Sequence, residues 1–389
     1  AWLLWVGSLG VAVLRLGTEG AWTVPGLVAV DGLTVVTWVA VTLFAAVVLS
    51  YSRRYLAGRT GVERFFRRAF GFVLVVSVLV AADHAVLFWG AWLAMGLVMA
   101  DLIGHVRAWP SARASARLAR RYFLASSGLL GVALVVLWAT TGATTVSRMV
   151  AAAGTMPPAA WLLVVVALVF AAAAQSALVP FHTWLLSSMT APTPASALMH
   201  AGFVNAGGVL LTRFAPVLTL DAAAMLLVTV VGATSALFGK LLKTVQPDVK
   251  RQLGCSTVGQ MGFMILQAGL GFFGAAITHL VLHGFYKAYR FLSSGEAVTR
   301  VGPGTDESTG AGSLGGLLVA VPTALAGGAV FAAITGKGTS VDTGLLLTAL
   351  VVVTTLHAVR VAVRRTGLPA PVRYGAVPLL ALPAVAVYA

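Results

Sequence analysis

Three ionisable side chains recur four residues apart in one apolar stretch, ITHLVLHGFYKAYRF, and are the clearest candidates for chemistry. On a helix, His279, His283 and Lys287 would lie within about 80° of one face. Histidine changes its charge near neutral pH, and a lysine shielded from water can do so too, so this stripe could pass protons along a hydrated path. Two other interpretations stay open: polar contacts between helices, and a zinc site, for which the motif supplies no third ligand.

Other polar residues stand inside or beside apolar stretches and are weaker candidates for the same relay. A lysine near the end of a stretch, such as Lys240, is explained equally well by a side chain that extends to the membrane surface. Lys337, in AAITGKGTS, could belong to a second helix break or to a loop. The weaker candidates are His182, His200, Lys240 and Lys337.

The elements that must position these residues are membrane-spanning helices. The chain is 59% hydrophobic and 10% charged, which is far more apolar than a soluble protein. Apolar runs of about 17 to 25 residues are long enough to cross a bilayer as helices, and a bilayer requires every backbone group to be bonded. We therefore predict an all-α polytopic membrane protein with 12–13 transmembrane helices. The runs are 1–16, 27–49, 66–83, 85–106, 119–141, 158–190, 193–212, 220–243, 253–273, 275–298, 312–335, 342–363 and 371–389.

The sixth run is too long for one crossing and contains a proline, which predicts a broken helix. Pro180 lacks a backbone N–H and clashes with the preceding turn of a helix. In transporters, broken helices at membrane depth mark ion sites, and Gln175 lies shortly before this break. A simple proline kink in a structural bundle is the alternative.

The charge pattern predicts orientation and excludes several classes of protein. The net charge of +15 comes from arginines gathered in short connections, such as 53–68 and 107–121, rather than in one stripe, which argues against a nucleic acid partner. These two connections are two crossings apart, so they share one side, which we predict to be cytoplasmic. The single cysteine, Cys255, provides no disulfide and no metal site. Because the sequence opens at Ala1 inside an apolar run, we expect a helix upstream of it.

Three blocks carry a resemblance to a known family. HTWLLSSMTAPTPASALMHAGFVNAGG, VKRQLGCSTVGQMGFM and HLVLHGFYKAYRFLSSG resemble consecutive signature blocks of the proton-translocating antiporter-like subunits of respiratory complex I and the Mrp antiporters. The resemblance runs over nearly the whole chain. It implies two inverted five-helix repeats with broken helices, at 66–212 and 220–363, between amino-terminal helices at 1–65 and a carboxy-terminal helix at 364–389.

Two departures from that family concern charge. Where its members carry a glutamate in a Trp-Glu-Gly block, GAWLAMGL places Leu93, and where they carry a lysine before the first break, this chain has Gln175. The resemblance thus implies that the first repeat lacks the charged pair of its relatives. The second repeat keeps the stripe of His279, His283 and Lys287.

The glutamate-free FWGAWLAMGL, together with VDGLTVVTWVAV and QSALVPFHTWL, resembles the membrane subunit of the DAB inorganic-carbon transporter. This likeness implies a multi-pass protein of the bacterial inner membrane that conducts H⁺ or Na⁺. Its partners would be membrane lipids and a large zinc-bearing, carbonic-anhydrase-like subunit, which would carry the catalysis. We expect no cofactor, no metal and no enzyme activity in this chain itself. A proton-pumping subunit of a quinone oxidoreductase, an Mrp-type antiporter and a non-conducting scaffold stay open as alternatives.

Overall fold

The computed structural model describes residues 1–18, 20–294, 314–338, 343–363, 369 and 371–388. The chain divides into two compact units, residues 1–298 and 299–389, each with its own internal packing. The predicted boundaries of the inverted repeats stay a prediction.

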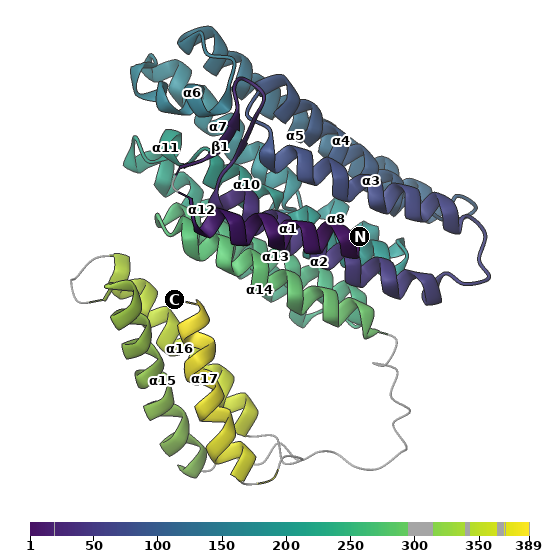
Figure 1. Ribbon diagram of the computed structural model, residues 1–389. Coiled ribbons are helices and arrows are strands. Elements are labelled where there is room, and N and C mark those ends of the chain that lie inside the picture. Colours follow the sequence, from purple (N-terminus) through teal and green to yellow (C-terminus); the bar gives the residue numbers. More distant parts are fainter. Residues whose placement is uncertain (19, 295–313, 339–342, 364–368, 370, 389) are drawn as a thin grey trace. The chain divides into compact units, whose positions relative to one another are not determined.

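Helices dominate both units (Figure 1). The long helices of the first unit are α1 (Trp2–Leu16), α2 (Gly32–Tyr55), α3 (Val62–Ala81), α4 (Ala85–Ile103), α5 (Pro110–Thr141), α7 (Pro158–Gln175), α12 (Ala222–Thr244), α13 (Val249–Gly269) and α14 (Phe273–Leu292). Its shorter elements are β1 (Trp22–Val24), β2 (Val28–Val30), α6 (Val146–Ala151), η1 (Ala153–Thr155), α8 (Thr183–Ser187), η2 (Ser188–Thr190), α9 (Thr193–Ala201), η3 (Phe203–Asn205), α10 (Ala206–Arg213) and α11 (Ala215–Leu218). The second unit contains α15 (Leu314–Thr335), α16 (Thr343–Val363), the π-helical turn η5 (Val372–Ala376) and α17 (Val377–Tyr388).

Eight segments within the described residues are long and apolar enough to cross a membrane, judged by length and composition. Three further helices, α3, α13 and α14, have 20 or 21 residues, which is about the length that a crossing needs. Each apolar run of the sequence contains at least one helix of the structure. The prediction of an all-α polytopic membrane protein is therefore confirmed. The eight segments are Gly32–Tyr55, Ala85–Ile103, Pro110–Thr141, Pro158–Gln175, Thr193–Arg213, Ala222–Thr244, Gly316–Thr335 and Gly344–Val363.

A small hairpin that the sequence did not predict joins α1 to α2. Strands β1 and β2 pair antiparallel, with Gly26 in the turn at a φ of 74°. The carbonyl of Leu27 accepts hydrogen bonds from the backbone N–H groups of Asp83 and His84, at 3.0 and 3.1 Å. Strands of three residues are too short to show an alternating pattern, which explains why the sequence gives no sign of them.

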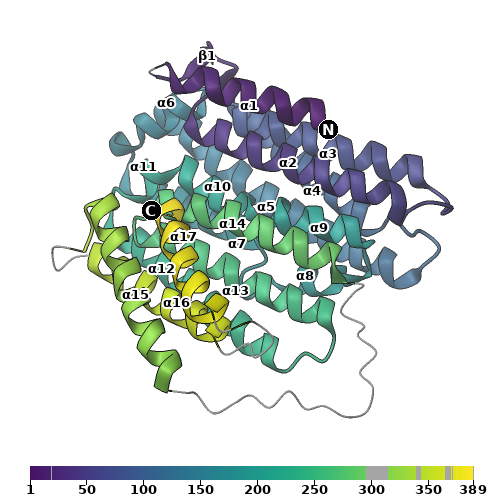
Figure 2. The same ribbon diagram turned by 60° about the horizontal axis from the view of Figure 1, so that its bottom comes forward.

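Glycines let α12 and α13 pack with their backbones in contact. A Cβ atom on Gly232 of α12 would lie 2.9 Å from the carbonyl oxygen of Gly262 on α13, and one on Gly269 would lie 2.8 Å from the Cα of Thr229. Small residues of this kind are how membrane helices approach closely without a hydrophobic drive between them. The contact holds α13 in place beside α14, which also packs against α2, α9 and α10 (Figure 2).

The helix break predicted in the sixth run is present between α7 and α8. Helix α7 ends at Gln175, and the chain turns before α8 begins at Thr183. Side chains bind the backbone groups that the break releases: Ser235 Oγ accepts from the N–H of Val179 at 3.1 Å, and Trp184 Nε1 donates to the carbonyl of Ala174 at 2.9 Å. The break is thus stabilised inside the protein, as irregular backbone at membrane depth must be.

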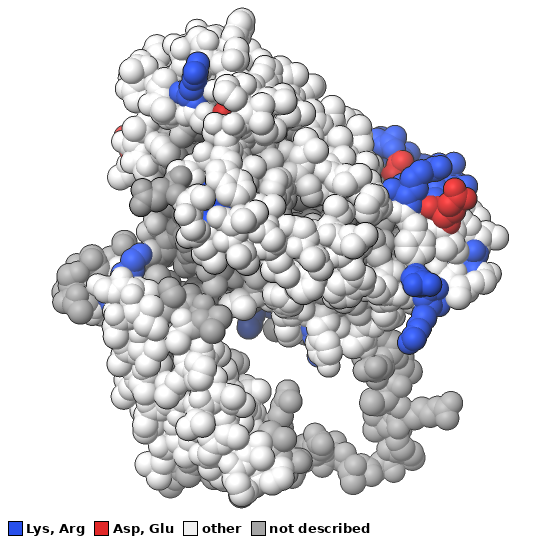
Figure 3. Space-filling model, viewed as in Figure 1, with Lys and Arg blue, Asp and Glu red and all other residues white. Residues whose placement is uncertain are grey.

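The two arginine-rich connections lie at one end of the first unit, as the sequence predicts. Arg68 of α3 and Arg120 of α5 both form ion pairs with Asp101 of α4, at 3.2 and 2.8 Å. Figure 3 shows basic side chains gathered around a few acidic ones over the ends of these helices. We call this region the arginine-rich end.

The second unit is a bundle of α15, α16 and α17. Helix α15 is continuous through Pro322 and ends at Thr335, followed by Gly336 and Gly338 with positive φ angles. Lys337 lies between these glycines and is exposed. The turn places this lysine after the helix rather than within a break of α15.

Candidate functional site

The polar stripe of α14 faces the interior of the first unit. His283 is 5% exposed and Lys287 is fully buried, whereas Tyr286 and Tyr289, on the other face of the same helix, are 53% and 67% exposed. His279, one turn before His283, is intermediate in burial. The helix therefore presents its ionisable side chains to its neighbours and its aromatic side chains outward.

Lys287 is held by a backbone carbonyl rather than by an acidic side chain. Its Nζ donates a hydrogen bond of 2.8 Å to the carbonyl oxygen of Leu253 on α13. No ion pair of Lys287 occurs within the described residues. A buried ammonium without a counter-ion is costly, so the Leu253 carbonyl is the contact that stabilises Lys287 within the described residues.

Thr257 links that carbonyl to His200 of α9. The hydroxyl of Thr257 donates to the carbonyl of Leu253 at 3.0 Å, and Thr257 Oγ1 lies 2.9 Å from His200 Nδ1. Which atom donates in the contact between Thr257 and His200 depends on the tautomer of the ring. The other ring nitrogen of His200, Nε2, is buried and has no partner within the described residues.

Two histidines continue the polar stripe along α14. The ring centroids of His279 and His283 are 6.0 Å apart, and the ring of His279 lies 5.3 Å from that of Phe263. His283 Nε2 is buried and has no partner within the described residues. The ring of His200 stacks on Phe291 at 4.3 Å, which fixes its plane. We call His200, Thr257, His283 and Lys287, with the Leu253 carbonyl, the polar cluster.

The helix break holds a second, uncharged polar group. Gln175 is fully buried, and neither its Oε1 nor its Nε2 has a partner within the described residues. His182, beyond Pro180, is half-buried, and its ring lies 5.6 Å from that of Phe238 on α12. The position for which the resemblance implies a lysine thus contains a neutral amide.

The remaining predicted relay residues lie away from the polar cluster or outside the first unit. Lys240 is exposed near the end of α12, and Lys337 is exposed in the second unit. Leu93, at the position for which the resemblance implies a glutamate, is half-buried in α4. The structure brings together His279, His283, Lys287 and His200, and it places His182 at the break.

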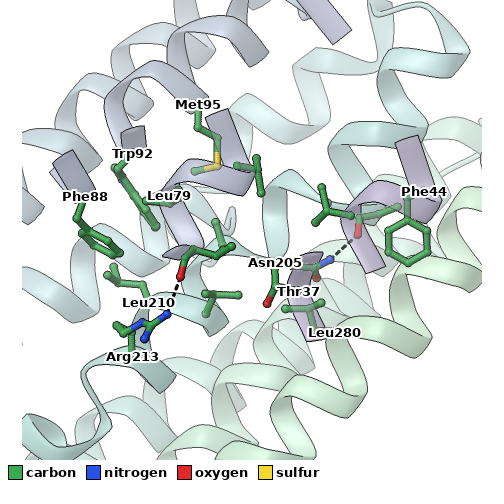
Figure 4. Close-up of a pocket in the computed structure, with 17 residues that line it drawn as sticks. Thr37, Phe44, Leu79, Phe88, Trp92, Met95, Asn205, Leu210, Arg213 and Leu280 are labelled. Carbon is green, nitrogen blue, oxygen red and sulfur yellow. Dashed lines mark hydrogen bonds between the residues drawn. The ribbon is translucent and has the colours of Figure 1, made fainter. Parts of the chain in front are cut away.

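An internal cavity of about 30 Å³ lies among α2, α3, α4, α10 and α14. Figure 4 shows Asn205 in its midst and Arg213 towards one end. Arg213 forms an ion pair with Asp31, the residue that caps α2, and donates to the carbonyl of Val80 at 2.7 Å. The cavity wall is otherwise mostly apolar.

Sequence reasoning missed three polar contributors. Thr257 is one hydroxyl among many in the chain, and nothing in its spacing reveals that it bonds His200. Asp31 and Arg213 stand 182 residues apart, so their pairing appears only in the folded protein. Their positions at the ends of apolar runs, with opposite charges, were the one available signal.

The sequence matches a family described as the NADH:quinone oxidoreductase/Mrp antiporter transmembrane family over residues 82–359. The chain belongs to this family. The match includes every residue of the polar cluster and the helix break. Membership confirms the resemblance drawn from the three sequence blocks.

Similar members of the family are named as probable inorganic carbon transporter subunits and as NADH-quinone oxidoreductase subunits. The probable inorganic carbon transporter subunit DabB1 of Halothiobacillus neapolitanus is 39% identical over 299 residues, which are 74% of this chain and 53% of that protein. The probable subunit DabB of Bacillus subtilis is 37% identical over 307 residues, 77% of this chain and 60% of that protein. NADH-quinone oxidoreductase subunit L of Mycobacterium tuberculosis is 34% identical over 279 residues, 71% of this chain and 43% of that protein. The chain thus spans about half the length of these family members.

A solved structure in the family shares the fold. The Mrp complex of a Dietzia species contains a chain with a TM-score of 0.72 and 27% sequence identity, and the likeness covers 100% of this chain and 48% of that one. The Mrp-like fold implied by the sequence is therefore confirmed.

Proposed function

We propose that this chain conducts a cation, H⁺ or Na⁺, as the membrane subunit of an inorganic carbon transporter in a bacterial inner membrane. Two similar family members are named as probable inorganic carbon transporter subunits, which supports the carbon assignment. The word subunit implies a complex. The partner we propose is a large zinc-bearing subunit similar to carbonic anhydrases, which hydrates CO₂ to bicarbonate.

The observation that carries conduction is the polar cluster. Lys287 and His200 are fully buried, and both connect to the Leu253 carbonyl, Lys287 directly and His200 through Thr257. Ionisable groups at membrane depth are costly and mark ion or proton pathways. In our proposal, Lys287 and the histidines of α14 exchange protons with His200, while the break at Pro180 gives His182 access to the path.

Coupling follows from the direction of the cation gradient. A cation that moves inward through the chain releases free energy, about 2.3 kcal/mol per charge for each 100 mV. In the complex, this free energy would bias the partner's reversible hydration of CO₂ towards bicarbonate. The described residues of this chain include no group of three His, Cys, Asp or Glu that could bind a metal. In this proposal, the hydration chemistry belongs to the partner.

Growth of a carbonic-anhydrase-deficient bacterium in air tests the proposal. The strain would carry this gene in full length with its genomic neighbour, as wild type, Lys287→Ala or Tyr286→Ala. Tyr286 is the matched control, because it is adjacent in sequence but on the exposed face of α14. We expect growth with the wild type and Tyr286→Ala, and none with Lys287→Ala at equal membrane expression. Failure of the well-expressed wild type to support growth would overturn the carbon assignment.

An Mrp-type antiporter is the second candidate, and the Mrp-like fold favours it. The neutral residues Leu93 and Gln175 argue against it, since they replace the charged pair of those relatives. Sodium resistance of an antiporter-deficient strain separates the two: we expect none from this chain. A non-conducting scaffold would be indicated if Lys287→Ala supports growth as well as the wild type does.

A further inference from the structure

The cavity that Asn205 and Arg213 line is large enough for water. Its volume of about 30 Å³ exceeds the roughly 10–15 Å³ that one water molecule needs, so it has room for about two. Leu280 of α14 lines the cavity, one turn before His283 and Gly284. The cavity therefore reaches the helix that carries the predicted relay.

Asn205 gives the cavity a polar group that lacks a partner. Its Nδ2 donates to the carbonyl of Ala201 at 2.7 Å, while its Oδ1 is buried and has no partner within the described residues. The side chain is 1% exposed and lies among the lining residues in Figure 4. An unsatisfied buried acceptor destabilises the folded protein, and a water molecule in the cavity would remove that cost.

An ion pair closes the opposite end of the cavity. Arg213 pairs with Asp31 and donates to Thr34 Oγ1 at 3.2 Å and to the carbonyl of Val80 at 2.7 Å. Asp31 also accepts from the backbone N–H of Thr34 at 2.8 Å. The side chains of Arg213 and Asp31 are 16% and 34% exposed, so the pair stands between the cavity and the surface. This surface is at the amino-terminal end of α2, away from the arginine-rich end.

We propose that the cavity holds water bonded to Asn205 and is the branch through which the polar cluster exchanges protons with the surface at Asp31, closed by the Asp31–Arg213 ion pair. The proton route rests on the proposed function, whereas the water site does not. The branch opens when Arg213 separates from Asp31. The proton is conducted through bonded water, and no residue of the apolar wall takes part.

The same lining argues against a sodium site. Hard cations in proteins take about six oxygen ligands. The side-chain oxygens that line the cavity are those of Asn205 and Thr37, and the Thr37 hydroxyl already donates to the carbonyl of Leu33 at 2.7 Å. Arg213 adds a positive charge at the end of the cavity. Among H⁺ and Na⁺, the branch therefore selects H⁺.

Radiolytic labelling of the full complex in membranes tests the water site directly. Hydroxyl radicals formed from internal water oxidise nearby methionines, and α4 provides a matched pair. Met95 lines the cavity, whereas Met99, one turn later, does not, and both are at most 1% exposed. We expect at least fivefold faster oxidation of Met95, measured by mass spectrometry. Equal, slow oxidation of the two methionines would overturn the proposal without any bearing on the carbon assignment.

Two variants test the route in proteoliposomes with a pH-sensitive dye inside. Asn205→Leu keeps the branched shape of the side chain and replaces its polar atoms by larger methyl groups, so we expect slow oxidation of Met95 and at least tenfold slower proton flux. Arg213→Gln breaks the ion pair with Asp31 that closes the cavity, so we expect a proton leak faster than that of the wild type. Normal flux in a folded Asn205→Leu variant would overturn the route, and so would the absence of a leak in a folded Arg213→Gln variant. Loss of flux in Lys287→Ala tests the relay separately.

Discussion

Helices α14 and α7 both belong to the first unit, yet their buried polar side chains differ in whether they have hydrogen-bond partners. On α14, Lys287 has the Leu253 carbonyl as an acceptor, and Thr257 and His200 extend the connection. On α7, Gln175 is just as deeply buried and has no partner for either amide atom within the described residues. Helix α7 carries no charged residue.

This difference indicates where charge can be moved in the molecule. A buried charge persists only where hydrogen-bonding groups are arranged around it, because desolvation is otherwise too costly. The α13–α14 region provides such groups, and the α7 break does not. We infer that Lys287 on α14 takes part in charge movement, and that Gln175 on α7 contributes shape rather than charge.

Replacing Lys287 and Gln175 each by methionine tests this difference between α14 and α7 most directly. Lys287→Met removes the amine and should lower transport at least 100-fold, since no other amine contacts the Leu253 carbonyl within the described residues. Gln175→Met removes an amide without partners and should change transport less than twofold. Transport is measured as uptake of labelled inorganic carbon by cells. Equal losses in both variants would place α7 in the conduction path.

The reverse substitution asks whether α7 can tolerate charge. Gln175→Lys places an ammonium in a fully buried site without an acceptor, so we expect a loss of roughly 3–5 kcal/mol in the free energy of unfolding. Thermal unfolding in detergent measures the change. Leu162→Lys, on an exposed position of the same helix, is the control and should cost less. A stable Gln175→Lys variant with altered pH dependence of transport would show that α7 retains a site for a charge.

A third substitution tests how the polar cluster depends on the packing of α13. A Cβ on Gly262 would lie 2.6 Å from the carbonyl carbon of Ser235, so Gly262→Ala forces α12 and α13 apart at a cost of about 1–3 kcal/mol. Gly274→Ala is the control, because a Cβ there meets nothing within 4 Å. We expect slower transport in Gly262→Ala, since Thr257 and Leu253 move with α13. Unchanged transport would mean that the cluster tolerates displacement of its helix.

How far the sequence could predict this site depended on the range of each interaction. The stripe on α14 was visible because charges in an apolar run are rare and their spacing follows the helix. The break was visible because proline acts on its own turn. The acceptor of Lys287 is a backbone carbonyl, which every residue has, so no sequence pattern could have identified Leu253.

The pairing of Asp31 with Arg213 shows the same limit at longer range. Taken alone, each residue is an interfacial charge at a helix end. Only the fold brings Arg213 of α10 to Asp31 and to the Val80 carbonyl of α3, at one end of a cavity. The exposed position of Lys337 also depends on where α15 ends. The part played by the second unit in transport stays a prediction.

The smallest predicted effect is on how the free energy of unfolding depends on pH, and it concerns His105. This residue lies at the arginine-rich end, outside the membrane-spanning helices. Burial lowers the pKa of His105 below its usual value of 6.5, and the neighbouring Arg68, Arg64 and Arg107 lower it further. Below pH 6.5, the unfolded chain therefore binds a proton that the folded chain does not, so the free energy of unfolding decreases as the pH falls towards the lowered pKa. His105→Phe, which can keep the ring packed against Phe65, removes this dependence. Thermal unfolding between pH 5 and 8 should show a shallower acid slope in the variant and parallel curves above pH 7. Identical acid slopes would mean that His105 takes up its proton without cost, and that the arginine-rich end is more open to water than its packing indicates.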